Sequence, residues 1–144
     1  MQNNESIRLL HECDSGIKMG IESISQVMDS VSSEKMKGML EQSLDEHREL
    51  SQKIETKLAD MGADGKNPNP IAQGMSRIKT GMKLTMDKCD ATVAGLMTDG
   101  CHMGIKSISK CINENSGADA SSRELAQRLV TIEEKLARNM RDYL

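Results

Sequence analysis

Apolar side chains recur at steps of three and four residues along four long stretches of this chain, and that periodicity limits the fold more than any other feature. Such a repeat places the apolar residues on one side of an α-helix, which must then be buried against another element. We predict helices over residues 4–31, 36–61, 88–112 and 121–143. No stretch gives a convincing strand, so we expect an all-α fold.

Short polar motifs predict where two of these helices begin. Asp87, with Asp90 three residues later, could cap the third helix. The sequence from Ser121 to Glu124 has the form of a capping box, in which two side chains satisfy the free N–H groups of a helix start. We expect this box to open the fourth helix.

The connection between the second and third helices is long enough to run the length of a helical bundle. Gly62 is a predicted helix stop, and a short amphipathic helix is predicted from Ile71 to Met86. A helix of about 28 residues is about 42 Å long, and an extended arm with about four helical turns spans that distance. We therefore predict one domain over residues 1–144, with hairpins 4–61 and 88–144 joined by a crossover, 62–87.

The two hairpins share a repeated segment. Residues 16–25 and 100–109 are identical at seven of ten positions at a constant offset of 84, and residues 40–44 match 125–129 more faintly at an offset of 85. We predict two duplicated halves related by a pseudo-twofold axis. Each repeated segment carries two glycines four residues apart on one helix face: Gly16, Gly20, Gly100 and Gly104. We expect them to allow close helix packing; the alternative is a hinge or a ligand groove at this crossing.

Composition excludes several classes of function. With 12 Met, one Tyr and no Phe or Trp, the core must consist of aliphatic and thioether side chains, and no aromatic ring except that of Tyr143 is available to stack on nucleobases. The net charge of −3 argues against a general nucleic-acid binder. No apolar run is long enough to cross a membrane and the first residues lack the apolar stretch of a signal peptide, so we expect a cytoplasmic protein.

The four cysteines show no metal-binding or redox spacing. They are Cys13, Cys89, Cys101 and Cys111. We expect them to act as small buried hydrophobic residues.

The hairpin pair, the crossover and the chain length resemble the ferritin-like superfamily, in particular the small bacterial four-helix-bundle proteins of the rubrerythrin and ferritin clan, most of which have no assigned function. The local markers are Asp14-Ser-Gly-Ile, Glu46-His47, Gly62-Ala-Asp-Gly and Thr98-Asp-Gly-Cys. This resemblance implies a ferritin-like antiparallel four-helix bundle. Active members hold two iron or manganese ions between the helices, with a Glu from each of two helices and a Glu-x-x-His pair from each of the others.

The residues of this chain depart from that ligand pattern. Lys18 and Cys101 stand where glutamates are expected, Leu44 lies three residues before His47, and the fourth helix contains no histidine. We therefore predict that the dinuclear site is lost, with neither a cofactor nor catalytic residues. Should iron or manganese bind after all, the candidate ligands are Asp14, Glu46, His47, Asp99, Cys101 and His102.

Three functions remain as hypotheses. The favoured one is a non-catalytic binding or structural protein that forms a homo-oligomer. The first alternative is a metal-binding ferritin-like protein. The second is an adaptor whose basic crossover helix, with Arg77, Lys79 and Lys83, binds an acidic protein partner or a membrane surface.

Overall fold

The computed structural model describes residues 3–63 and 89–144, and its regular elements in these ranges are all helical. Four α-helices, α1 (Asn4–Val27), α2 (Glu34–Asp60), α4 (Asp90–Glu114) and α5 (Ala120–Met140), account for most of these residues. Single turns of 3-10 helix follow α1 and α5, and the described ranges contain no strand. The predicted all-α class is confirmed.

Most of the helix ends lie close to their predicted positions. The side chain of Ser33 accepts a hydrogen bond from the backbone N–H of Met36 and so caps α2. Gly62 has a positive φ of 68°, a conformation that glycine adopts without steric cost, and it follows directly on the last turn of α2. The first helix is shorter than predicted, because a 3-10 turn replaces the α-helix after Val27.

The predicted cap of α5 is wrong. The helix begins at Ala120, and Asp119 rather than Ser121 is its N-cap, accepting a hydrogen bond of 2.7 Å from the N–H of Ser122. The backbone N–H of Asp119 in turn donates to the Ser6 hydroxyl, also at 2.7 Å. A contact with the first helix therefore fixes the helix start, and the local motif does not reveal it.

The predicted role of Asp90 is also wrong. The N-cap of α4 is Cys89, which makes no capping hydrogen bond with its side chain, whereas Asp87 lies outside the described residues. The Asp90 carboxylate instead accepts hydrogen bonds from the backbone N–H groups of Ser32 and Ser33, at 2.7 and 3.1 Å. It thereby ties the start of α4 to the loop between α1 and α2.

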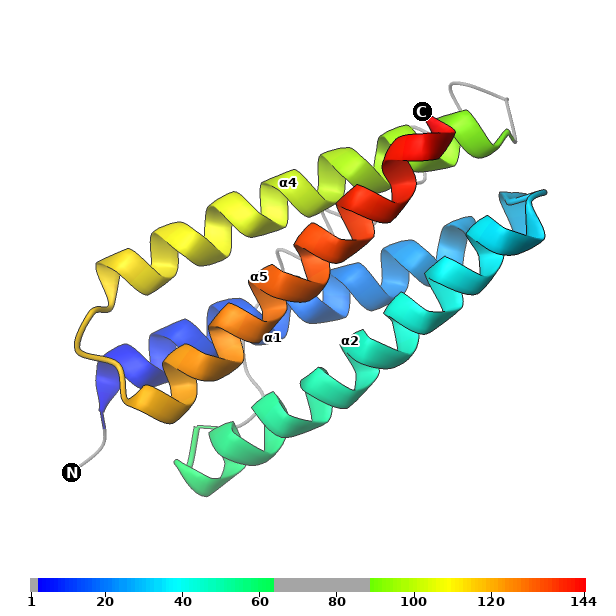
Figure 1. Ribbon diagram of the computed structural model, residues 1–144. Helices are drawn as coiled ribbons and strands as arrows, with labels where there is room; N and C mark the ends of the chain where they lie inside the picture. The colour runs from blue at the N-terminus through cyan, green and yellow to red at the C-terminus, as the bar shows by residue number, and fades with distance from the viewer. Residues whose placement is uncertain (1–2, 64–88) are drawn as a thin grey trace.

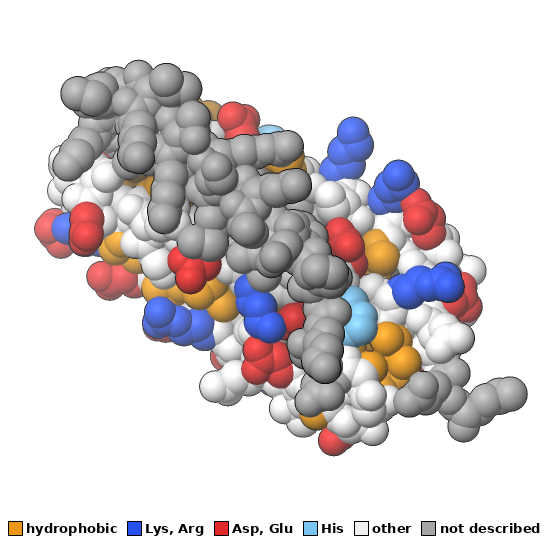
Figure 2. Space-filling model, turned by 180° about the vertical axis from the view of Figure 1, so that it is seen from behind, with side chains coloured by type: hydrophobic (Ala, Val, Ile, Leu, Met, Phe, Trp, Pro, Cys, Tyr) orange, Lys and Arg blue, Asp and Glu red, His pale blue; other side chains and the backbone are white. Residues whose placement is uncertain are grey.

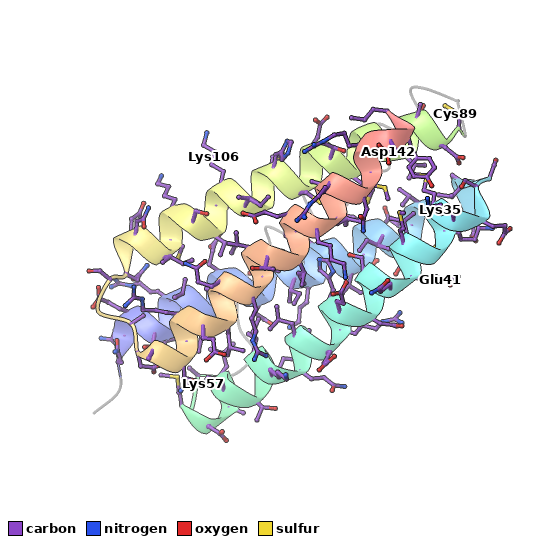
Figure 3. The ribbon with its side chains drawn as sticks, viewed as in Figure 1. Lys35, Glu41, Lys57, Cys89, Lys106 and Asp142 are labelled. Carbon is purple, nitrogen blue, oxygen red and sulfur yellow. The ribbon has the colours of Figure 1, made fainter. Side chains whose placement is uncertain are left out.

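The helices form a bundle in which α1 lies beside both α2 and α4, and α5 completes the square (Figure 1). The colour gradient shows that α1 and α5 run in one direction and α2 and α4 in the other. Lys57, near the end of α2, and Cys89, at the start of α4, lie at opposite ends of the molecule (Figure 3). The predicted crossover helix, with Arg77, Lys79 and Lys83, lies outside the described residues.

The core consists of two apolar clusters that lie one after the other along the bundle, and all four helices contribute to both. The first cluster includes Leu9, Leu10, Ile17, Ile54, Leu58 and Leu129. The second includes Ile24, Val27, Met36, Leu40, Met97 and Met140. As composition requires, both are aliphatic and thioether in character, and Tyr143 only packs against the edge of the second.

Burial follows the same pattern in the two hairpins. Buried positions of α1 recur 84 residues later in α4, as for Leu9, Leu10, Cys13, Ile17 and Ile24 with Val93, Ala94, Met97, Cys101 and Ile108. Buried positions of α2 recur 86 residues later in α5, as for Met36, Leu40, Ser43, His47 and Leu50 with Ser122, Ala126, Leu129, Glu133 and Leu136. The predicted offset for the second helices, 85, is therefore one residue short of the burial pattern. The duplication itself stays a prediction.

Where described side chains are visible on the surface seen from behind, acidic, basic and hydrophobic ones are interspersed (Figure 2). Within the described residues, no helix has the length and apolar character needed to span a membrane.

Candidate functional site

His47, in the middle of α2, is a fully buried polar residue with no solvent exposure. Its Nδ1 lies 2.7 Å from the backbone oxygen of Ser43, and its Nε2 lies 2.6 Å from Oε1 of Glu133 on α5. A backbone carbonyl can only accept a hydrogen bond, so Nδ1 carries a proton and donates it. When the ring is protonated at both nitrogens, Nε2 donates to the Glu133 carboxylate in an ionic hydrogen bond.

The surroundings of His47 favour the charged form of the His47–Glu133 pair. Burial lowers the pKa of His47, but the hydrogen bond and the negative charge of Glu133 raise it more, and the net pKa lies above the ordinary value of 6.5. Glu133 is itself 8% exposed. The imidazolium and the carboxylate therefore compensate each other inside the bundle, where either charge alone would be costly.

A third group, Cys101 of α4, contacts the pair. Burial raises the pKa of its thiol, and the nearby charge of Glu133, to which the thiol donates a hydrogen bond, raises it further. Because the thiolate is the nucleophilic form of cysteine, this thiol is inert at neutral pH. The three side chains form a polar centre that offers no activated nucleophile.

The sequence singled out His47 as a candidate metal ligand but did not point to Glu133. A signal existed, because Glu133 continues the three-and-four spacing of buried positions that runs through Leu129, Val130 and Leu136. A glutamate on such a seam requires a partner, and the sequence alone does not tell which helix supplies it.

The pair lines one side of a groove of about 370 Å³ between α1 and α4. The walls of this groove come largely from the repeated segments. Five of the seven identical pairs have both members in the lining, and the two exceptions are Ile21 with Ile105 and Ser25 with Ser109. These lining pairs are Gly16 with Gly100, Met19 with Met103, Gly20 with Gly104, Ser23 with Ser107, and Ile24 with Ile108.

The expected close helix packing at the repeated glycines is wrong for the described residues. A Cβ atom added to Gly100 would have no described neighbour within 4 Å, and one added to Gly16 would make only ordinary contacts, the nearest at 3.8 Å. At Gly104 the nearest atom would be Oε2 of Glu133, at 3.6 Å, and at Gly20 it would be the His47 ring, at 2.9 Å. The glycines leave space for the His47–Glu133 pair and for the groove. They do not bring the backbones of α1 and α4 into contact.

The residues considered as metal ligands do not converge. Asp14 forms an ion pair with Lys18 at 2.9 Å, and Glu46 forms one with Lys135 at 3.2 Å. Asp99 and His102 are exposed, and both ring nitrogens of His47 are already bonded. No group of three or more His, Cys, Asp or Glu that could hold a metal ion occurs in the part of the chain that the structure describes. The present residues therefore do not fit the dinuclear centre that the resemblance implies.

The cysteines divide into two kinds, and none forms a disulfide. Cys13 and Cys101 are buried as predicted, and burial raises the pKa of Cys13 to about 12. Cys89 and Cys111 are only half-buried, which corrects the expectation that all four lie in the core.

A second hollow, of about 520 Å³ between α2 and α5, is a less convincing site. Two of its ion pairs lie within one helix, Lys53 with Glu49 at 3.7 Å and Arg128 with Glu124 at 3.3 Å, and Lys57 pairs with Asp119 at 3.6 Å. Such exposed pairs are typical of a solvated helix surface.

Comparison with known proteins identifies no relative. No family model matches the chain, and no match was found among curated proteins or solved structures.

Proposed function

We propose that this chain is a non-catalytic binding protein whose small-molecule ligand occupies the groove between α1 and α4. The observation that carries the proposal is that the residues kept identical between the two halves, among them Met19, Gly20, Met103 and Gly104, line this groove on both sides. Helix packing alone does not account for this, because a side chain at Gly100 would meet none of the described atoms.

The same proposal includes a ferritin-like bundle. The directions of the four helices support it, since α2 and α4 are parallel and are joined between opposite ends of the molecule. In this view the His47–Glu133 pair stands at the place where ferritin-like proteins bind metal. One imidazolium and one carboxylate neutralise each other there, whereas a metal centre needs an excess of negative ligands.

Methionine methyl groups report binding directly. In protein with methyl-labelled methionine, hexanol is added as a neutral apolar probe and followed by NMR. We expect the signals of Met19 and Met103, which line the groove, to shift in a saturable way. The signals of Met36 and Met140, fully buried in the second cluster, should stay unchanged.

Two glycine variants locate the site. Gly100→Leu places a side chain into the groove, whereas Gly38→Leu places the same side chain at another exposed helical position with no neighbour within 4 Å. We expect the first variant to abolish the response to hexanol and the second to retain it, with both folded by circular dichroism. No response in the unmodified protein, or an equal loss in both variants, would overturn the proposal.

Metal analysis tests the competing function. We expect purified, untreated protein to contain no stoichiometric iron, manganese, zinc or copper. Metal bound at one or two ions per chain and lost on His47→Ala would replace the proposed function by that of a metal-binding ferritin-like protein.

A further inference from the structure

The charged side chains that line the groove are, besides His47, all acidic. They are Glu12 on α1, Asp99 on α4 and Glu133 on α5, and no Lys or Arg of the described residues joins them. The charge of Glu133 is already balanced by His47. Glu12 and Asp99 thus give the described lining of the groove a net negative charge.

These two acids stand on opposite walls and toward opposite ends of the groove. The contact between Gly16 and Ile108 sets the register of α1 against α4, so that Glu12 lies level with Ile112, while Asp99 lies nearer the start of α4. At about 1.5 Å of rise per residue, the two carboxylates are separated by about 20 Å along the bundle. The rest of the lining is mostly glycine, methionine, leucine and isoleucine, together with three serines.

An apolar ligand with one positive end matches this arrangement. Its hydrocarbon part would contact Met19, Met97 and Met103, whose flexible thioether side chains adapt to different shapes. Its cationic end would lie at Asp99 or at Glu12, near solvent, where a partly hydrated ion loses little solvation energy. An anionic end would meet like charge at either position.

We propose that the ligand of the groove is an apolar organic amine bound as its ammonium cation. This inference rests on the proposed binding function and adds the chemical class of the ligand.

A series of probes with one chain and three head groups tests the inference. Hexylamine is a cation at pH 7, hexanol is neutral and hexanoate is an anion. Affinities are measured from the Met19 and Met103 methyl signals at low and high salt. We expect hexylamine to bind at least about fivefold more tightly than hexanoate at low salt, with hexanol between them, and the difference to shrink as salt rises.

Two double variants assign the effect to the groove. Glu12→Gln with Asp99→Asn removes the two lining charges. Glu41→Gln with Asp142→Asn removes two exposed acids on α2 and beyond the end of α5, neither of which lines the groove (Figure 3). Both change the net charge equally. We expect the first to remove the preference for hexylamine over hexanol and hexanoate, and the second to leave the preference intact.

The outcomes separate the two proposals. Binding of hexanol or hexanoate as tightly as hexylamine refutes the amine and leaves the binding function standing. An equal effect of both double variants also refutes it, because the preference would then come from overall charge. Absence of binding by all three probes defeats the binding function itself.

Discussion

At the scale of single residues, Gly20 and Gly104 occupy equivalent places in the repeated segments but meet different neighbours. A methyl group at Gly20 would lie 2.9 Å from Cδ2 of His47, in a ring held at both nitrogens. At Gly104 it would lie 3.6 Å from Glu133, an ordinary contact. Gly20 is therefore required by the central pair, whereas Gly104 is not.

This difference predicts opposite effects of one substitution at two matched sites. Gly20→Ala should lower the free energy of unfolding by about 1–3 kcal/mol, because the ring cannot yield without breaking a hydrogen bond. Gly104→Ala should be neutral or should add up to about 1 kcal/mol through better helix propensity. Urea denaturation measures both, and equal effects would contradict the assigned role of Gly20.

The His47–Glu133 pair makes stability depend on pH. The pKa of His47 is raised in the folded protein, so the folded state holds the proton to higher pH than the unfolded chain does. The stabilisation is complete below the ordinary value of 6.5 and is lost as pH rises through the folded pKa.

Glu133→Gln provides the comparison, since it keeps the shape and removes the charge. We expect unfolding in urea to show a difference of about 3 kcal/mol between the two proteins below pH 6.5, narrowing at higher pH. Nitrogen NMR of the imidazole gives the pKa directly, and a value at or below 6.5 in the unmodified protein would contradict the ion pair.

At the scale of elements, the start of α5 depends on Asp119. Its carboxylate accepts a hydrogen bond from the backbone N–H of Ser122. Burial raises the pKa of Asp119, but its hydrogen bonds lower it more, so the net pKa lies below the ordinary value. Asp119→Ala should cost about 1 kcal/mol of unfolding free energy, as loss of an N-cap does. Ser121→Ala, at the predicted cap, should change it little. The reverse order in thermal or urea denaturation would restore Ser121 as the cap.

The periodicity of apolar residues predicted the helices because the buried face of any helix needs apolar side chains three and four residues apart. This spacing does not depend on how the helices pack in detail. It did not predict the caps at Asp119 and Cys89, because distant contacts set them. Ser6 fixes the conformation of Asp119, and Asp90 bonds to the loop before α2. A local motif cannot report a partner more than fifty residues away.

At the scale of the whole molecule, some features of the candidate site could be predicted from the sequence and others could not. The repeated glycines were visible in the sequence, and His47 was a candidate there as a metal ligand. The pairing of His47 with Glu133 was not visible, because it depends on how α2 and α5 are aligned in space. A ligand groove at the repeated glycines was only the alternative prediction, because an open space between α1 and α4 depends on how the four helices are spaced.

Each of the four helices contributes residues to both core clusters, so neither cluster belongs to one hairpin alone. We therefore expect the two clusters to unfold as one unit. Leu9 lies in the first cluster and Leu40 in the second, and both are fully buried. We expect Leu9→Ala and Leu40→Ala each to lower the unfolding free energy by about 2–5 kcal/mol. As distant sites without shared partners, their effects should add to within about 0.5 kcal/mol. A single transition with an unchanged denaturant slope is expected in each variant, whereas a second transition would show that the clusters are independent domains.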